Sequence, residues 1–306
     1  SSNTRMPCVD RPSLAQIQHH RDRRFRRLPE LKVHNEGEAL AFLNSVGLAF
    51  LFGAKGVTMP TLWGAIAGSH RPPPAHHDDP DLGRAWDWKD TLPARRDVFY
   101  GALIRGKPTF VSRALLPAAY ALSPNYGDPL DYLEHYEAGL LSVEARRIYE
   151  VLLNQGAMAT SLLRQAAGLA GGGAVARRFN AALQELQMQL RIAKIGISDA
   201  SRWGYAYVYD LFIRHYPEVP EEARSISTDA AMEALLLCHL ENVAAESENA
   251  LLRLFRWEPW EWDRLIARLV AREAIVHEVE IEGIRGRACV HAGLLSSGAL
   301  AKPERR

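Results

Sequence analysis

The feature that most constrains the fold is a pattern that occurs twice in the second half of the chain, in which three helical segments are followed by a two-stranded hairpin. The first copy runs from Ser142 to about Asp210, and the second runs from Ser227 to about His291. In each copy apolar residues recur at helical spacing and then alternate along the hairpin, which indicates amphipathic helices followed by half-buried strands. The copies share order and length but not sequence, so the pattern constrains the fold more than the chemistry.

Capping residues set the element boundaries in the first copy. Ser142 is a favourable residue to begin a helix, and Gly156 is a favourable residue to end one. The glycine run 171–173 predicts the turn before the third helix. The three helices and two strands of this copy are predicted over 142–155, 160–167, 174–190, 192–197 and 203–209, with a turn at Ser198-Asp199.

The second copy is marked in the same way. Ser227 and Ser247 are expected to cap two helices, and Pro259 is typical of the first turn of a third. The predicted helices and strands of this copy span 227–243, 247–255, 259–270, 274–281 and 285–291.

Two helices, a longer third helix and a hairpin form the order of a winged helix-turn-helix module, whose third helix enters the DNA major groove. We therefore predict a mainly α chain with small β-hairpins (α+β), built from tandem winged helix-turn-helix modules. The predicted domains are a basic N-terminal arm (1–35), an N-terminal domain that could be an elaborated winged helix (36–140), two winged helices (141–222 and 223–292) and a flexible tail (293–306).

The first half is less regular. Helices are predicted over 38–52, 61–66 and 94–105, and a strand leading into a helix over 109–122. The basic run 19–27 is interpreted as an amphipathic or flexible arm, with a phosphate-contacting arm as the alternative.

Composition limits the function classes. Apolar residues make up 47% of the chain and charged residues 24%, which is typical of a globular protein, and the formal net charge is +1. A nucleic-acid-binding face must therefore be local. The three cysteines, Cys8, Cys238 and Cys289, are odd in number and scattered, so we expect a reduced, cytoplasmic protein with no metal site. No segment predicts a membrane span, a cofactor or an obligate protein partner.

The cationic residues of the two modules suggest DNA as the partner. They lie on the third helices and the hairpins, where phosphates and base edges are usually contacted. The alternative is a solvated helix face whose arginine stems cover the core. The candidate nucleic-acid-binding residues are Arg177, Arg178, Asn180, Arg191, Lys194, Arg202, Tyr205, Arg264, Arg268, Arg285 and Arg287.

Three blocks of sequence resemble the AlkZ/YcaQ-like winged-helix DNA glycosylases, which unhook interstrand crosslinks. The resemblance covers about residues 36–291. Its blocks are Gly47-Leu48-Ala49-Phe50-Leu51-Phe52, then Lys107-Pro108-Thr109-Phe110-Val111-Ser112 through Leu116-Pro117, and Arg178-Phe179-Asn180-x-x-Leu183-x-x-Leu186. It implies a divergent member of that family.

The chain departs from the family at the catalytic element. The resemblance implies a Gln-hydrophobic-Gln or Gln-hydrophobic-Asp triplet after the Gly-Leu segment, and here those polar positions are Phe50 and Phe52. Phenylalanine can neither polarise a water molecule nor accept its proton. The family chemistry is therefore expected to be absent, or to be carried by polar residues such as Lys55, Lys89 or Asp90.

Three functions follow as hypotheses. The first is a DNA-binding relative of the glycosylases that recognises duplex or damaged DNA. The second is an active glycosylase with a substituted active site, acting on alkylated or crosslinked bases. The third is a transcriptional regulator that reads its site as a dimer.

Overall fold

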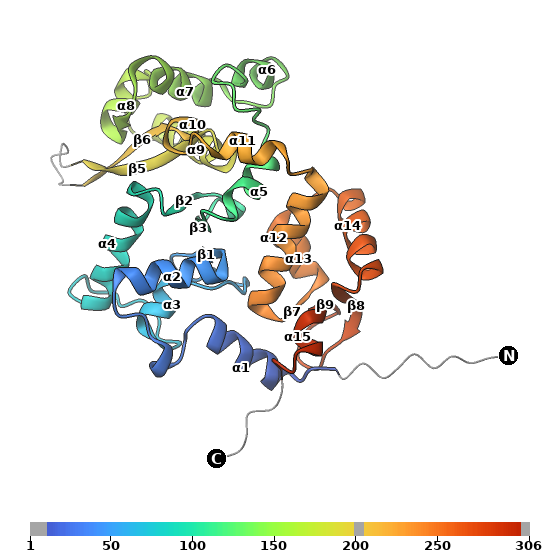
Figure 1. Cartoon of the computed structure of the whole chain (residues 1–306). Helices are drawn as coiled ribbons and strands as arrows, with labels where there is room; N and C mark the ends of the chain where they lie inside the picture. The colour runs from blue at the N-terminus through green and yellow to red at the C-terminus, as the bar shows by residue number, and fades with distance from the viewer. Residues whose placement is uncertain (1–10, 199–204, 301–306) are drawn as a thin grey trace.

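The computed structural model of the chain describes residues 11–198 and 205–300 (Figure 1). Its strands form three antiparallel sheets of three strands, with the orders β1-β3-β2, β4-β6-β5 and β7-β9-β8. The strand that comes last in the chain is central in every sheet. Each sheet belongs to a unit with the chain order helix, strand, helix, helix, strand, strand. We call these units the first module (36–112), the middle module (143–211) and the last module (228–291).

This element order confirms the predicted fold class, and the same order also occurs in the first half of the chain. We call the hairpin that ends each module its wing. The first module comprises α2 (Glu36–Val46), β1 (Leu48–Phe50), α3 (Leu62–Ala67), α4 (Pro80–Ala94), β2 (Val98–Ala102) and β3 (Pro108–Ser112). The middle module comprises α7 (Val143–Gln155), β4 (Met158–Ala159), α8 (Thr160–Ala166), α9 (Ala174–Met188), β5 (Ile192–Ser198) and β6 (Ala206–Leu211). The last module comprises α12 (Thr228–Val243), β7 (Ala245–Ser247), α13 (Glu248–Phe255), α14 (Pro259–Ala271), β8 (Ile275–Glu280) and β9 (Arg287–His291).

Shorter elements connect and flank the modules. They are α1 (Leu14–Arg24), the 3₁₀ turns η1 (Pro29–Leu31) and η2 (Ile104–Gly106), α5 (Leu116–Ala121), α6 (Tyr132–Glu137), α10 (Phe212–His215), α11 (Val219–Arg224) and α15 (Ala292–Ser296). No helix among the described residues has the length and hydropathy needed to cross a membrane. The domain limits predicted from the sequence, including the tail from 293, stay predictions.

Serine caps begin the helices as predicted. The side chains of Ser142, Ser227 and Ser247 each accept a hydrogen bond from a backbone N–H in the first turn of α7, α12 and α13. Such caps satisfy amides that have no partner within the helix. Of the hairpin predicted in the middle module, Asp199 and Trp203 lie outside the described residues.

Two predictions for the first half were wrong. The helix predicted to reach Phe52 ends at Val46, because Gly47 has a φ of +71° and the next residues form β1. The helix predicted from Ala94 to Arg105 lies earlier in the chain, at α4. It begins there because Asp79 caps its first turn. Residues 98–102 instead form β2, which pairs with β3.

One hydrophobic cluster joins the three modules. Phe50 and Phe99 from the first module's sheet are buried with Phe212 and Tyr216, which follow β6, and with Leu254 from α13. Figure 1 shows the middle module above the first module and the last module beside it. The first module therefore holds the other two in place through this shared core.

The basic N-terminal segment is packed and is not a detached arm. Ile17 of α1 is fully buried in a cluster with residues of the last module. Arg21 donates hydrogen bonds to the carbonyl oxygens of Val243 (2.9 Å) and Ala245 (2.7 Å). These carbonyls follow the end of α12, where a cation compensates for acceptors left without helical partners. Part of the positive charge of this segment therefore serves the fold.

His239 is a buried histidine on α12. Its side chain is 1% exposed, its ring lies edge-on to Phe255, and its Nδ1 has no hydrogen-bond partner among the described residues. Burial, with a smaller contribution from Arg21, lowers the pKa of His239 to about 3.

This burial predicts a loss of stability in weak acid. The unfolded chain binds a proton at His239 below a pH of about 6.5, whereas the folded chain does not, so the free energy of unfolding falls as the pH falls from 6.5 towards 3. We expect His239 to contribute a slope of about 1 kcal/mol per pH unit, which His239→Leu removes. Urea unfolding at pH 7, 6 and 5 measures it. Equal slopes in the two proteins would contradict the prediction.

Candidate nucleic-acid interface

A groove crosses the first, middle and last modules. It consists of three adjoining depressions. The first, of about 540 Å³, lies between α1 and the loops that follow β1 and α3. The second, of only about 10 Å³, shares Val57 and Thr58 with the first. The third, of about 560 Å³, lies between η2, α9 and α13, and shares Arg105 and Leu254 with the second. We call these three neighbouring depressions together the central groove.

Cations without ion pairs gather along the central groove. Arg105 and Arg253 line it, and so does Arg256 at the end of α13. Lys55 lies in the loop between two lining glycines, Gly53 and Gly56. None of the four forms an ion pair within the part of the chain that the structure describes. Sequence reasoning had considered only Lys55, because the other three lie on the wing of the first module and on the second helix of the last module.

Arg105 and Arg256 also have unusual backbone conformations. Their φ angles are +53° and +54°, in the left-handed region that is unfavourable for residues with a side chain. The Nε of Arg105 is buried with no hydrogen-bond partner among the described residues. Strained residues and unsatisfied donors tend to cluster at functional sites. Arg105, in the turn between β2 and β3, combines a strained backbone with an unsatisfied donor and is therefore a candidate functional residue.

The two positions at which the resemblance implies polar catalytic residues, Phe50 and Phe52, have apolar surroundings in this structure. Phe50 is 1% exposed and lies in the cluster that joins the modules. Phe52 is half-buried, with its ring centroid 6.4 Å from that of Trp63 and 6.1 Å from that of Trp86. Neither position offers a polar group to a ligand.

Lys89 and Asp90 form a buried polar cluster outside the central groove. Lys89 is 1% exposed, and its Nζ donates to Asp90 Oδ1 at 2.8 Å, to the Tyr205 hydroxyl at 2.5 Å and to the Tyr207 hydroxyl at 2.6 Å. Tyr205 also donates to the second oxygen of Asp90. Burial lowers the pKa of Lys89, and the Asp90 carboxylate opposes that shift. The cluster joins α4 to the wing of the middle module, with the Lys89 ammonium buried and the Tyr205 side chain exposed at its edge.

Lys194, on the same wing, lies against aromatic rings. Its Nζ is 4.1 Å from the ring centroid of Tyr207 and 4.8 Å from that of Tyr100. Burial lowers the pKa of Lys194 to about 8, and the nearby Lys89 ammonium contributes in the same direction. Its ammonium is therefore engaged within the protein. The neighbouring candidate Arg202 lies outside the described residues.

The third helix of the middle module keeps three of its candidates on the surface. Arg177, Arg178 and Asn180 of α9 are exposed, and Arg178 Nε lies 4.0 Å from a Glu144 oxygen. Arg191 is instead buried, and it donates to Asp131 Oδ1 at 2.8 Å. A buried, paired guanidinium cannot reach a phosphate, so Arg191 leaves the set of binding candidates.

The arginines on α14, the third helix of the last module, are paired with acids on α12, the first helix of that module. Arg264 and Arg268 of α14 both pair with Asp229 on α12, at 2.6 and 3.0 Å. On the wing of this module, Arg287 pairs with Glu278 at 2.6 Å, whereas Arg285 is exposed and has no ion pair with a described residue. The arginines of this module without ion pairs to described residues therefore lie at α13 and on the wing, and not on α14, the helix that the sequence favoured.

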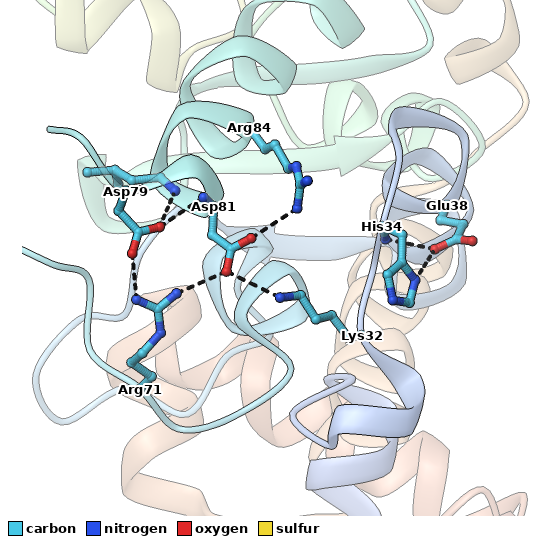
Figure 2. Close-up of polar contacts among 8 residues, drawn as sticks. Lys32, His34, Glu38, Arg71, Asp79, Asp81 and Arg84 are labelled. Carbon is cyan, nitrogen blue, oxygen red and sulfur yellow. Dashed lines mark hydrogen bonds and ion pairs between the residues drawn. The ribbon is translucent and has the colours of Figure 1, made fainter.

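A network of ion pairs holds the wall of the first depression (Figure 2). Arg71 bridges Asp79 (2.8 Å) and Asp81 (3.0 Å) at the start of α4, and Lys32 also pairs with Asp81, at 3.2 Å. The Arg71 guanidinium lies 4.8 Å from the ring centroid of Trp63. These contacts fix the loop 69–79 against α4, so the depression has a defined wall.

A carboxylate and an imidazole meet in the same depression. Asp22 of α1 and His70 both line it, and His70 Nε2 lies 2.7 Å from Asp22 Oδ1. Arg27 donates to the same oxygen from Nε at 3.1 Å and from Nη2 at 3.0 Å. No local pattern predicts this pair, because its members are 48 residues apart in the chain. Among the described residues, no three His, Cys, Asp or Glu side chains are grouped so as to hold a metal ion.

Comparisons with known proteins agree with this architecture. The family model described as "AlkZ related" matches residues 33–256. The structure is similar to that of Streptomyces sahachiroi DNA glycosylase AlkZ, with a TM-score of 0.60 and 12% sequence identity, over 96% of this chain and 73% of that one. At that identity the similarity concerns the fold alone. A search of curated proteins found no match.

The environment of Lys194 predicts a stability difference in alkali. The folded chain loses the Lys194 proton near pH 8 and the unfolded chain near pH 10.4, so the contribution of Lys194 to the free energy of unfolding rises with pH in that interval. Between pH 7 and 9.5 we expect the wild type to gain about 2 kcal/mol relative to Lys194→Met. Chemical denaturation of both proteins at the two pH values measures this. A constant difference would show that Lys194 titrates normally.

Proposed function

This chain belongs to the AlkZ-related family, and we propose that it binds duplex DNA along the central groove as a DNA-repair glycosylase-like protein. The observation that carries the proposal is the distribution of cations without ion pairs. Lys55, Arg105, Arg253 and Arg256 lie along one groove, whereas the arginines of α14 are paired with acids of α12.

Charge pairing decides which arginines bind DNA. A guanidinium without a carboxylate partner can exchange counterions and water for a phosphate, and the release of those counterions drives binding. A guanidinium that is already paired must first lose its acid, so it contributes less. The net charge of +1 is compatible with DNA binding, because a positive field is needed only at the groove and not over the whole surface.

The other exposed cations extend the proposed interface. Arg177, Arg178 and Asn180 at the start of α9 are placed to contact the DNA backbone or base edges beyond the groove, and Tyr205 and Arg285 lie on the wings of the middle and last modules. The DNA glycosylase named in the comparison makes damaged DNA the ligand of first choice. The fold alone would fit a regulator equally well.

The test is the salt dependence of binding. Each phosphate contact contributes about 0.9 to the slope of log K against log salt. Replacing Arg105, Arg253 and Arg256 together with alanine should therefore weaken binding of a 20-base-pair duplex and reduce the slope by about 3. Fluorescence anisotropy at several salt concentrations measures both.

A matched control uses the paired arginines. Arg264→Ala with Arg268→Ala removes two positive charges without touching the groove, so affinity and slope should remain those of the wild type. If this control loses as much affinity as the groove variant, binding follows total charge and the proposed groove is not the interface.

A further inference from the structure

The outward face of α14 is apolar and exposed. Trp260, which is 63% exposed, lies on this face together with Ala267, Val270 and Ala271, all of them exposed. Residues at such helical spacings are neighbours on one side of a helix, so the four form a stripe. The opposite side of α14 packs into the core of the last module. Figure 1 shows the helix at the right-hand edge of the molecule, and none of its residues lines the central groove.

The charges around the stripe favour a protein over a nucleic acid as its partner. Exposed tryptophan in an apolar patch is typical of an interaction surface. The arginines beside it are already paired with acids of α12. The start of α14 carries carboxylates that form no ion pair with a described residue and that would repel a phosphate backbone. We call them the acidic start of the helix, and they are Glu258, Glu261 and Asp263.

The remainder of α14 is basic, so the charge changes sign along the helix. Its arginines are Arg264, Arg268 and Arg272. These three share only two acids, Asp229 and Glu233, which leaves one positive charge in excess. A second copy of α14 running antiparallel would place its acidic start beside this basic end, and the two helix dipoles would also oppose each other favourably. The charge pattern is therefore complementary to itself.

Side-chain size along the stripe is complementary to itself in the same way. Trp260 is large and lies near the start, whereas Ala271 is small and lies at the end. In an antiparallel pair the indole of each copy covers Ala271 of the other, and the small Ala267 between them lets the two helix axes approach closely. The same register brings Glu261, on one flank of the stripe, beside Arg272 of the second copy.

We propose that α14 is the contact surface of a symmetric dimer of this chain, in which two copies of the helix pack antiparallel through Trp260, Ala267 and Ala271. A two-fold contact requires such a self-complementary surface. The helix has 13 residues and is about 20 Å long, so one pair of helices buries less than a standard interface and the dissociation constant is expected to be about micromolar. The contact shares no residue with the central groove, so the dimer keeps two open grooves.

The first test is sedimentation velocity of the full chain over a range of micromolar concentrations. The wild type should shift from monomer to dimer as its concentration rises. Trp260→Ala should raise the dissociation constant about 30-fold or more, because a central aromatic contact is lost twice in a symmetric dimer. The matched control Tyr126→Ala removes an aromatic side chain of equal exposure, 64%, from outside α14 and should leave the constant unchanged.

A pair of charge reversals tests the antiparallel arrangement. Glu261→Arg places two arginines side by side in the dimer, and Arg272→Glu places two glutamates there, so each variant alone should be monomeric. A mixture of the two should form a heterodimer, because one contact then joins arginine to glutamate and the other keeps the original pair. Recovery in the mixture also shows that both variants are folded.

The outcomes decide the proposal. A dimer that Trp260→Ala weakens, and that the mixed reversals restore, supports it. A wild type that stays monomeric overturns it, and so does a dimer that Trp260→Ala leaves intact or a mixture that fails to associate. The same Trp260→Ala sample is titrated with duplex DNA. Unchanged duplex affinity agrees with the proposal, whereas weaker affinity in a protein that forms no dimer would show that α14 contacts DNA instead.

Discussion

The relative placement of the first and middle modules depends on one buried ammonium group. A lysine ammonium has three donors, and Lys89 has three acceptors, one from its own helix and two from the wing of the middle module. A buried charge with an unmet donor costs several kcal/mol, so the wing must stay where both tyrosine hydroxyls reach Nζ. The same wing leads directly from α9, which forms one wall of the central groove. The position of that wall therefore depends on the Lys89 cluster.

The second constraint is the placement of acids. The chain has 37 Lys and Arg against 36 Asp and Glu, so its positive residues outnumber its acids by one. Acids on α12 neutralise the arginines of α14, and Asp131 neutralises Arg191 in the interior. Among the described residues, the arginines on η2 and α13 form no ion pairs, although acids also line the groove. The free positive charge of the groove therefore depends on which arginines are left unpaired and not on the total number of bases.

Local signals in the sequence predicted most of the second half, and long-range contacts limited the rest. Serine caps and helical periodicity located α7, α12 and α13 because capping and amphipathicity are properties of neighbouring residues. The strand β2 was missed because Val98 to Ala102 is a short apolar run, which a helix and a buried strand share. Asp22 and His70 were missed for a related reason. Asp22 and His70 come into contact only because α1 packs against the rest of the chain, and that packing cannot be predicted from the periodicity of the basic run.

Phe50 and Phe52, the positions at which the resemblance implies polar residues, differ in how far they belong to the packing. Phe50 lies in the cluster that also holds Phe99, Phe212 and Tyr216, so its ring stabilises the junction of the three modules. A glutamine there would leave an amide without partners, at a cost of about 1–3 kcal/mol, and would remove a buried ring as well. Phe52 is different, because it is half-buried between two tryptophan rings at the edge of the first module's core. Phe50 therefore serves the packing of the three modules, whereas Phe52 could be changed at a lower cost to the core.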